Sequence, residues 1–303
     1  MNTSEKKLVL IDGNAIIHRA YHAMPHLTTP KGDAIGAVQG FLNILLRIIT
    51  DIKPTHIAVA WDRKEPTFRH KAFKDYQIQR PETDKELISQ FSKVRQVLEV
   101  FDIAFFDKAG FEADDIIGTF AHKAQKHFEE IIIVTGDKDQ LQLVNTKTKV
   151  YMPAKGVSVG VVLGEKEVYE KLGVRPDQVV DLKAFMGDQS DNYPGVFGIG
   201  PKTAQTLLKK YDTYPKTYKH LDELPESVRE KLINGKDGGD ISYKLARIVN
   251  DVDVDFKPDD LNVWSVGNNK TLQLFDEYGF RTLTKRVKEV GAKMVGEKQQ
   301  KLF

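Results

Sequence analysis

The sequence predicts an α/β fold: a mostly parallel, twisted sheet flanked by helices and followed by a helical C-terminal region. Four short apolar segments of strand character alternate with segments of helical periodicity up to residue 137. From about Asp177 onward the strand pattern stops, and the chain has the character of helices joined by loops. With 303 residues, of which 41% are hydrophobic, the chain can bury a sizeable core.

The four predicted strands are residues 7–12, 56–62, 103–106 and 131–137. The first is followed by a predicted helix over residues 15–23. A second helix is predicted from apolar residues at helical spacing, which share one face: Val38, Phe41, Leu42, Leu45, Leu46 and Ile49. Strands that alternate with helices pair in parallel and are covered on both faces, so these segments predict a buried parallel sheet.

The chain is predicted to divide near residue 175. Residues 1–175 form the α/β domain, and residues 176–290 form the helical region. The last residues, 291–303, are predicted to be a flexible tail, because chain ends are poorly ordered unless they are held.

The composition excludes several classes of protein. The chain has no cysteine, which excludes disulfides and cysteine-based metal or nucleophile chemistry. It shows no signal peptide and no apolar run of membrane-spanning length, so we expect a cytoplasmic protein with no membrane contact. The net charge is only +2, but setting aside the nine carboxylates described below leaves 34 acidic against 45 basic residues. This excess favours a nucleic-acid partner over ordinary solvated lysines.

Residues 63–100 interrupt the alternation with many basic side chains, interleaved with Phe68, Phe73 and Tyr76. One interpretation is an amphipathic helix with a solvated basic side. The other is an element that grips phosphates and stacks the bases of a single strand. The position directly after the strand-terminal Asp62 favours the second.

Acidic residues follow each of the four predicted strands, and a fifth pair lies downstream. The nine are Asp12, Asp62, Glu112, Asp114, Asp115, Asp137, Asp139, Asp188 and Asp191. Because ligands bind beyond the carboxyl ends of parallel strands, we expect these side chains to gather at one edge of the sheet. One strand-end aspartate is most often a helix cap, but caps do not explain acids after four successive strands.

So many carboxylates in one cleft repel one another and require a cation. The candidate metal ligands are all hard carboxylate oxygens, and no histidines cluster with them. This set of ligands selects two Mg²⁺ (or Mn²⁺) ions over zinc. Such a pair can activate water and stabilise a phosphate under attack. A calcium-storage or structural cation site is the alternative, although the calcium-loop spacing D-x-D-x-D-G is absent.

The glycine-rich segment PGVFGIGPKT at residues 194–203 resembles a Walker A loop. Pro201 intrudes before Lys202, and the segment follows an acidic loop, so we reject nucleotide binding. We expect instead a tight hairpin between helices, with the backbone amides of a helix that starts at Pro201 facing a phosphate. Such a hairpin grips duplex DNA without reading its sequence, whereas the alternative is a plain connection between helices.

Six motifs follow one another along the chain: LIDGNAIIHRAYHA, the WD pair at 61–62, TFRH with the later Tyr76 and Arg80, GFEADDIIGT, TGDKDQLQL, and MGDQSDNYPGVFGIGPKTA. Together they resemble the 5′-nuclease family, which includes the flap endonucleases and the N-terminal 5′-3′ exonuclease domain of bacterial DNA polymerase I. The resemblance covers about residues 6–250.

The resemblance implies a PIN-like fold, a helical arch at about 63–100 that admits a single-stranded 5′ end, and a helix-hairpin-helix that holds duplex DNA, often through a bound K⁺. The substrate would be branched or 5′-flapped DNA, cut in replication and repair by a monomer. By motif position, all nine acids would be metal ligands. The catalytic residues would be Asp12, Asp62, Asp115, Arg69 and Arg80. The DNA contacts would be Arg69, Lys71, Lys74, Tyr76, Arg80, Gly198, Gly200, Lys202 and Thr203.

Two features depart from the family pattern. Bacterial members usually carry a lysine after the arch tyrosine, but here Gln77 follows Tyr76; Lys74 and Arg80 are the candidates to compensate. The chain also ends at Phe303 without a polymerase module, so we expect a nuclease that stands alone or a piece of a longer protein. The final residues Gln299–Phe303 resemble the short peptides that bacterial proteins insert into the sliding clamp.

Two other functions stay open. Gln77 suggests a branched-DNA binding protein whose catalysis has weakened, although the acids are intact. A PIN-type ribonuclease is the second, but the helical C-terminal region and its hairpin favour DNA junctions over RNA.

Overall fold

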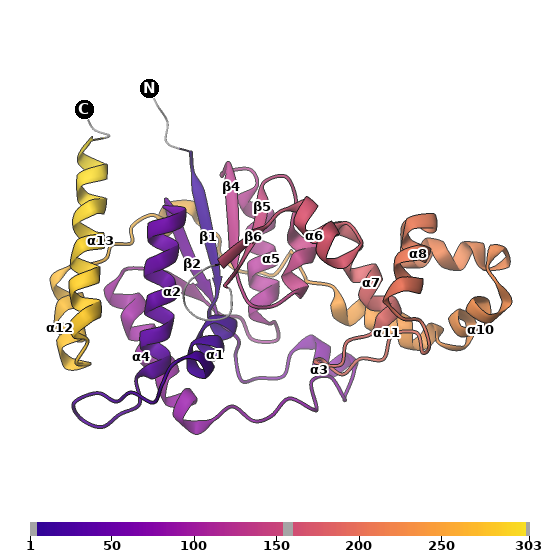
Figure 1. Ribbon diagram of the computed structural model, residues 1–303, viewed down its shortest axis with the longest axis horizontal. Coiled ribbons are helices and arrows are strands. Elements are labelled where there is room, and N and C mark those ends of the chain that lie inside the picture. Colours follow the sequence, from indigo (N-terminus) through magenta and orange to yellow (C-terminus); the bar gives the residue numbers. More distant parts are fainter. Residues whose placement is uncertain (1–4, 154–159, 301–303) are drawn as a thin grey trace.

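The computed structural model describes residues 5–153 and 160–300. Within these residues, six strands form one twisted sheet in the order β3-β2-β1-β4-β5-β6. All neighbouring strands pair in parallel except β5 and β6, which are antiparallel. Helices cover both faces of the sheet, and a helical region extends to one side (Figure 1). The predicted α/β class, with its mostly parallel sheet and helical C-terminal region, is confirmed.

The strands are β1 (Lys7–Asp12), β2 (His56–Ala60), β3 (Ala104–Phe106), β4 (Glu130–Val134), β5 (Thr148–Pro153) and β6 (Gly160–Leu163). The four predicted strands are confirmed as β1 to β4. The last two were not predicted. The β5 sequence TKVYMP mixes polar and apolar residues, and β6 lies at the sheet edge with two exposed valines, so neither has the continuous apolar run of a buried strand.

The helices in chain order are α1 (Gly13–Ala23), α2 (Gly36–Ile52), α3 (Phe68–Ala72), α4 (Lys85–Val100), α5 (Ala113–Ala124), η1 (Asp139–Leu143), α6 (Glu165–Leu172), η2 (Pro176–Gln178), α7 (Val179–Met186), α8 (Pro201–Tyr211), α9 (Tyr214–Thr217), η3 (Tyr218–Glu223), α10 (Glu226–Asn234), α11 (Lys236–Ala246), η4 (Pro258–Leu261), α12 (Asn269–Glu277) and α13 (Arg281–Gln300). Among residues 5–153 and 160–300, no helix is long and apolar enough to cross a membrane.

The two faces of the sheet bury different side chains of the same strand. On β1, Val9 and Ile11 point into a core shared with α1, α2 and α4, whereas Leu8 and Leu10 point into a core shared with α5. This two-residue alternation follows from the strand pleat. The predicted apolar face of α2 is fully buried in the first core.

The chain returns to the sheet after its helical region. Helices α12 and α13 lie beside α4 and α2, at the opposite end of the molecule from α8 and α10 (Figure 1). Phe275, Leu283 and Val287 join the first core there. Residues 291–300, expected to be a flexible tail, continue helix α13, while residues 301–303 of the expected clamp peptide lie outside the described residues.

Residues 63–100 do not form continuous helix. Only α3 and α4 are helical, and residues 73–84 between them run in turns and extended chain. Helix α4 belongs to the core, because Leu87, Val94 and Leu98 are fully buried. The part of this segment that faces the carboxyl ends of the strands is therefore residues 63–80.

Candidate active site

A cleft of about 310 Å³ opens beyond the carboxyl ends of the strands. Six of the nine predicted acids line it: Asp62, Glu112, Asp114, Asp137, Asp139 and Asp191. Its other wall carries Arg63, Lys64, His70, Tyr76, Gln77 and Arg80. We call this cavity the acidic cleft. It brings together side chains from the strand ends, from the 63–80 segment and from the loop after α7, as the parallel topology requires.

Two strand-end aspartates also hold local structure. Asp12 caps α1 by accepting from the backbone of Ala15 at 2.9 Å, and it accepts from the Thr135 hydroxyl at 2.8 Å. Asp62 accepts from the backbone of Ala113 at 2.7 Å, at the start of α5. Asp12 is 4% exposed and lies behind the cleft, whereas Asp62 is exposed to it. Helix capping thus accounts for one carboxylate oxygen of each aspartate. The second oxygen of Asp62 can bind another partner.

The start of α5 places three acids in one turn. Glu112 is the N-cap, and Asp115 accepts from its backbone at 3.1 Å, closing a capping box. Asp114 points toward the cleft, where one oxygen accepts from the Gln140 amide at 2.7 Å. The positive end of the α5 dipole favours carboxylates at this position.

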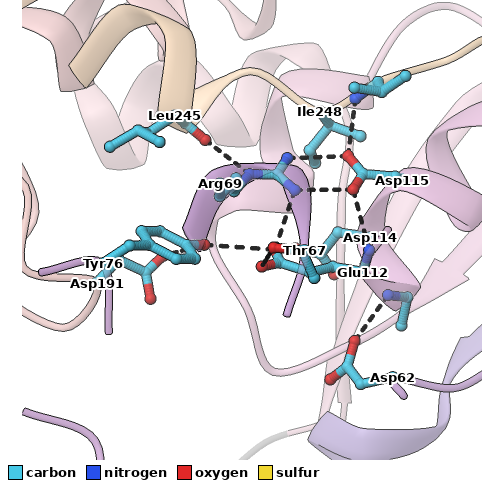
Figure 2. A network of polar contacts seen from close by, with 12 residues as sticks. Asp62, Thr67, Arg69, Tyr76, Glu112, Asp114, Asp115, Asp191, Leu245 and Ile248 are labelled. Atoms are coloured by element: carbon cyan, nitrogen blue, oxygen red, sulfur yellow. Dashed lines mark hydrogen bonds and ion pairs between the residues drawn. The ribbon is translucent and has the colours of Figure 1, made fainter. Parts of the chain in front are cut away.

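Arg69 and Asp115 form a buried pair at the centre of this network (Figure 2). The guanidinium donates to both oxygens of Asp115, at 2.7 and 2.9 Å, and contacts Glu112 at 3.1 Å. It also donates to the backbone carbonyls of Leu245 and Arg247, each at 2.9 Å. Arg69 contributes to the lining of the cleft although it is only 2% exposed, whereas Asp115 is inaccessible and lies behind it.

The opposite side of the cleft is closed by contacts to Asp191. Arg80 pairs with Asp191 at 2.7 Å, and the Gln77 amide donates to the same oxygen at 3.2 Å. The Tyr76 hydroxyl lies 3.3 Å from Glu112 and 3.5 Å from Asp191, so it spans the two walls (Figure 2). Gln77, which stands where the family has lysine, adopts a positive φ of 56° and also donates its backbone N–H to Asp191.

The loop after α7 folds into a small hairpin in which Asp188 and Tyr193 pair. This acidic hairpin, residues 188–193, presents Asp188 and Asp191. Lys183 on α7 contacts Asp188 at 2.6 Å and also pairs with Asp139. Lys183 is therefore a functional candidate that the sequence analysis missed.

Burial and crowding shift several of these carboxyls. Burial raises the pKa of Asp12 to about 7, with Asp62 and Asp137 adding repulsion. Burial likewise raises the pKa of Glu112 to about 7, against the opposing effect of Arg69. Burial and nearby Asp137 raise the pKa of Asp114 well above its usual value. Burial acts in the same sense on Asp188, but Lys183 and Ser190 outweigh it and lower that pKa to about 2.

The glycine-rich segment connects α7 to α8. Gly200 is the N-cap of α8 and Pro201 its first residue, as predicted. Val196 and Ile199 are buried, whereas Phe197 between them is 91% exposed at the hairpin tip. Lys231 donates to the carbonyl of Gly198 at 3.2 Å, which ties the tip to α10. Lys202 lies exposed on the first turn of α8.

Comparison with known proteins assigns the family. The profile of the 5′-3′ exonuclease N-terminal resolvase-like domain matches residues 7–173, and that of the 5′-3′ exonuclease C-terminal SAM fold matches residues 174–270. The chain belongs to the 5′-3′ exonuclease family. It is thus a nuclease by family, and the resemblance noted in its motifs is confirmed.

Curated relatives of this exonuclease are bacterial DNA polymerases. The chain is 40% identical over 291 residues to DNA polymerase I of Bacillus subtilis, covering 96% of this chain and 33% of the relative. It is 35% identical over 252 residues to the thermostable DNA polymerase I of Thermus thermophilus, covering 82% and 30%. The chain therefore spans about a third of the length of the curated relatives that it matches.

Solved structures share its fold. A pseudo-enzyme-product complex of the bacteriophage T5 flap endonuclease with DNA and metal ions matches with a TM-score of 0.66 at 18% identity, covering 94% of this chain and 98% of that one. The catalytic core of Rad2 in complex with a DNA substrate matches with a TM-score of 0.60 at 16% identity, covering 95% and 92%.

Within the described residues, no three acids converge closely enough to hold an ion as they stand. Basic and amide groups lie between the carboxylates: Lys183, Arg69, Arg80 and Gln140. Lys183 and Gln140 were not predicted from the sequence, nor were the carbonyls of residues 245–247. Lys183 lies five residues before Asp188, and that proximity was the available signal.

We expect Asp115→Asn to destabilise the exonuclease by about 3–5 kcal/mol, because it leaves the buried Arg69 guanidinium without its counter-charge. Urea unfolding measures this change. Glu65→Gln is the matched control, since it breaks an exposed 3.0 Å pair with Arg63. That change is expected to cost less than about 1 kcal/mol. Equal losses in the two variants would contradict the assignment of Arg69 and Asp115 as a structural pair.

We also expect the stability in chelator to fall as the pH rises. The folded state holds protons on Asp12 and Glu112 up to about pH 7, whereas the unfolded chain releases them near pH 4. The folded state therefore binds more protons between these values, and the free energy of unfolding decreases with rising pH.

The test range is pH 6.5 to 8, because burial lowers the pKa of three histidines (His18, His56 and His70), which act in the opposite sense below pH 6.5. Across that range the melting temperature should drop by about 5 °C. Asp12→Asn should flatten the slope. A wild-type melting temperature that rises toward pH 8 would contradict the raised pKa values.

Proposed function

We propose that this chain is a Mg²⁺-dependent, structure-selective 5′ nuclease that cuts branched or 5′-flapped DNA in replication and repair. The carrying observation is the acidic cleft, in which carboxylates from the strand ends and from the acidic hairpin meet beside a basic wall. The adjoining glycine-rich hairpin can bind the backbone of duplex DNA, which supports the proposal that the substrate has a duplex next to the cut site. Mn²⁺ is the expected substitute for Mg²⁺.

The donor set fits hard divalent ions, since it consists of carboxylate oxygens whose mutual repulsion a cation relieves. We propose two ions. The first ion would be held by Asp114 and the four acids named in the next paragraph. The second would be held by Asp139 and by Asp188 and Asp191 of the acidic hairpin. When bound, such ions supply a hydroxide nucleophile near neutral pH and neutralise the charge that develops on the phosphate.

The other ligands of the first ion would be Asp12, Asp62, Glu112 and Asp137. Asp12 would be the innermost of these ligands, because it is 4% exposed and lies behind the cleft. The Gln140 amide, bonded to Asp114 at 2.7 Å, fixes the direction of that carboxylate. Capping of α5 does the same for Asp62.

For Arg69 and Asp115 the contacts support a positioning function. Their polar atoms are used in bonds to each other, to Glu112 and to the backbone at the C-terminal end of α11. We propose that this pair sets the position of Glu112 at the cleft and couples it to the helical region. Direct contact of either residue with metal or DNA would require the pair to separate, at the cost of an uncompensated buried charge.

We propose that the 5′ strand of the DNA passes along the exposed basic side chains of residues 63–80. Arg80 faces the cleft, and Lys71 and Lys74 are exposed beside it. Tyr76 is 4% exposed and bonded to acids on both walls, so it would close the cleft rather than stack freely. Gln77 stands where the family has lysine, and we propose that Arg80, which lines the cleft, or the exposed Lys74 contacts the phosphate instead.

The duplex would lie against Gly198, Gly200, Lys202 and Thr203, and this hairpin would hold a K⁺ ion whose charge attracts the phosphate backbone. We further propose that the protein acts as a monomer in the cytoplasm. We also propose that Gln299–Phe303 binds to a sliding clamp. Binding of that peptide to a clamp, with Leu302→Ala as its control, tests the last of these.

The deciding assay uses a labelled 5′-flap duplex with Mg²⁺ or with chelator. We expect cleavage only with Mg²⁺, and we expect Asp114→Asn to lower kcat at least about 100-fold with little change in DNA affinity. Intact binding without any cleavage would favour the alternative of a catalytically weakened branched-DNA binding protein. Preferred cleavage of a matched RNA flap would favour a ribonuclease.

Phe197 offers a separate test of the hairpin. Because its ring is 91% exposed, Phe197→Ala should leave the melting temperature unchanged. Loss of an aromatic contact with DNA should raise KM for the flap duplex by about 10-fold, with kcat unchanged. Val263→Ala, at a residue that is 61% exposed and outside the hairpin, is the control. An unchanged KM in the Phe197 variant would place the duplex elsewhere.

A further inference from the structure

Lys183 occupies an unusual position for a lysine. It belongs to α7, yet its ammonium lies between two carboxylates from separate segments: Asp188 of the acidic hairpin, at 2.6 Å, and Asp139 of η1. The side chains of all three residues are only 15–17% exposed. The pair of contacts therefore holds a positive charge inside the acid cluster.

This arrangement differs from the other ion pairs around the cleft. Arg80 is 51% exposed and pairs with Asp191 alone, so solvent competes with that contact. Arg69 is 2% exposed at the lining of the cleft, and its guanidinium pairs with Glu112 and Asp115 of α5 and its N-cap, not with the acidic hairpin. Within the described residues, Lys183 is the cation that joins Asp139 to the acidic hairpin, and its ammonium lies 5.9 Å from the centre of the Tyr193 ring.

We infer that Lys183 is a resident cation of the acid cluster, which a divalent ion must displace from Asp139 and Asp188 before it binds to them. The inference rests on the proposed metal-dependent function and adds to it a regulation of the second ion. Mg²⁺ and Mn²⁺ bind through carboxylate oxygens, and here the oxygens of two candidate ligands already face an ammonium. Metal and lysine therefore compete for the same negative charge.

Two consequences follow. Without metal, Lys183 stabilises the fold by offsetting repulsion between acids that the chain brings together from η1 and the acidic hairpin. With metal, the ions bind unequally, because Lys183 must first leave both Asp139 and Asp188, whereas Asp114 accepts from the neutral Gln140 amide. The flexible four-carbon stem of lysine allows the ammonium to leave without movement of α7.

The test is Mn²⁺ binding to the full chain, measured by calorimetry and by the loss of the free-ion paramagnetic signal. We expect the wild type to bind one Mn²⁺ tightly and a second weakly. Lys183→Met keeps the length of the side chain and removes its charge, and it should tighten the weaker event about 10-fold. Lys183→Arg should leave that event weak. Lys171→Met, at an exposed lysine of α6, should change neither event.

The outcomes separate the two proposals. Failure of the wild type to bind any Mn²⁺ overturns the metal-dependent function. Binding by the wild type with the same affinities in Lys183→Met overturns the displacement by metal. A second measurement needs no variant: amine acetylation of Lys183, followed by mass spectrometry, should be slow without metal and several-fold faster with saturating Mn²⁺. Equal rates overturn the inference even if Lys183→Met does not fold.

Discussion

The structure depends on one buried interaction, the two-point contact between Arg69 and Asp115. Arg69 comes from the segment after β2, Asp115 from the start of α5, and the carbonyls that complete the guanidinium's contacts from the C-terminal end of α11. The Arg69 guanidinium thereby connects three segments that are distant in the sequence. Because a buried guanidinium is tolerated only when its donors are satisfied, the geometry of all three is constrained together. The acidic cleft lies directly against this junction, so its shape depends on it.

A second constraint is the repulsion among carboxylates that the parallel topology brings to one edge. The chain offsets it in part with its own donors: Arg80 at Asp191, the Gln140 amide at Asp114, and Lys183 at Asp139 and Asp188. The remaining acids keep raised pKa values, as at Asp12 and Glu112. Such a cluster is poised for a cation, and it is also the part of the fold that gains most from one.

The first four strands were predicted because each is a short apolar run and these runs alternate with segments of helical periodicity. Strands β5 and β6 were not predicted, since their burial is decided by neighbours in the sheet and not by their own pattern. The strand-end acids were recognised through their spacing, but spacing alone treats Asp115 and Asp114 alike. In the fold they point in different directions, one into the interior and one toward the cleft. Lys183 was missed because a single lysine on a helix has no distinguishing pattern.

The sequence by itself determined the α/β class, the edge of the sheet where the acids gather, the hairpin that starts α8 and the 5′-3′ exonuclease family. These follow from local periodicity and from ordered motifs, which need no knowledge of distant contacts. Only the tertiary structure decided which carboxylates face the cleft, which are bound by arginine or lysine, and how the C-terminal end of α11 meets Arg69. Those outcomes depend on contacts between residues more than 40 positions apart, such as Arg69 with Asp115 and Lys183 with Asp139. Their free energies arise from burial, which a linear pattern of residues does not specify.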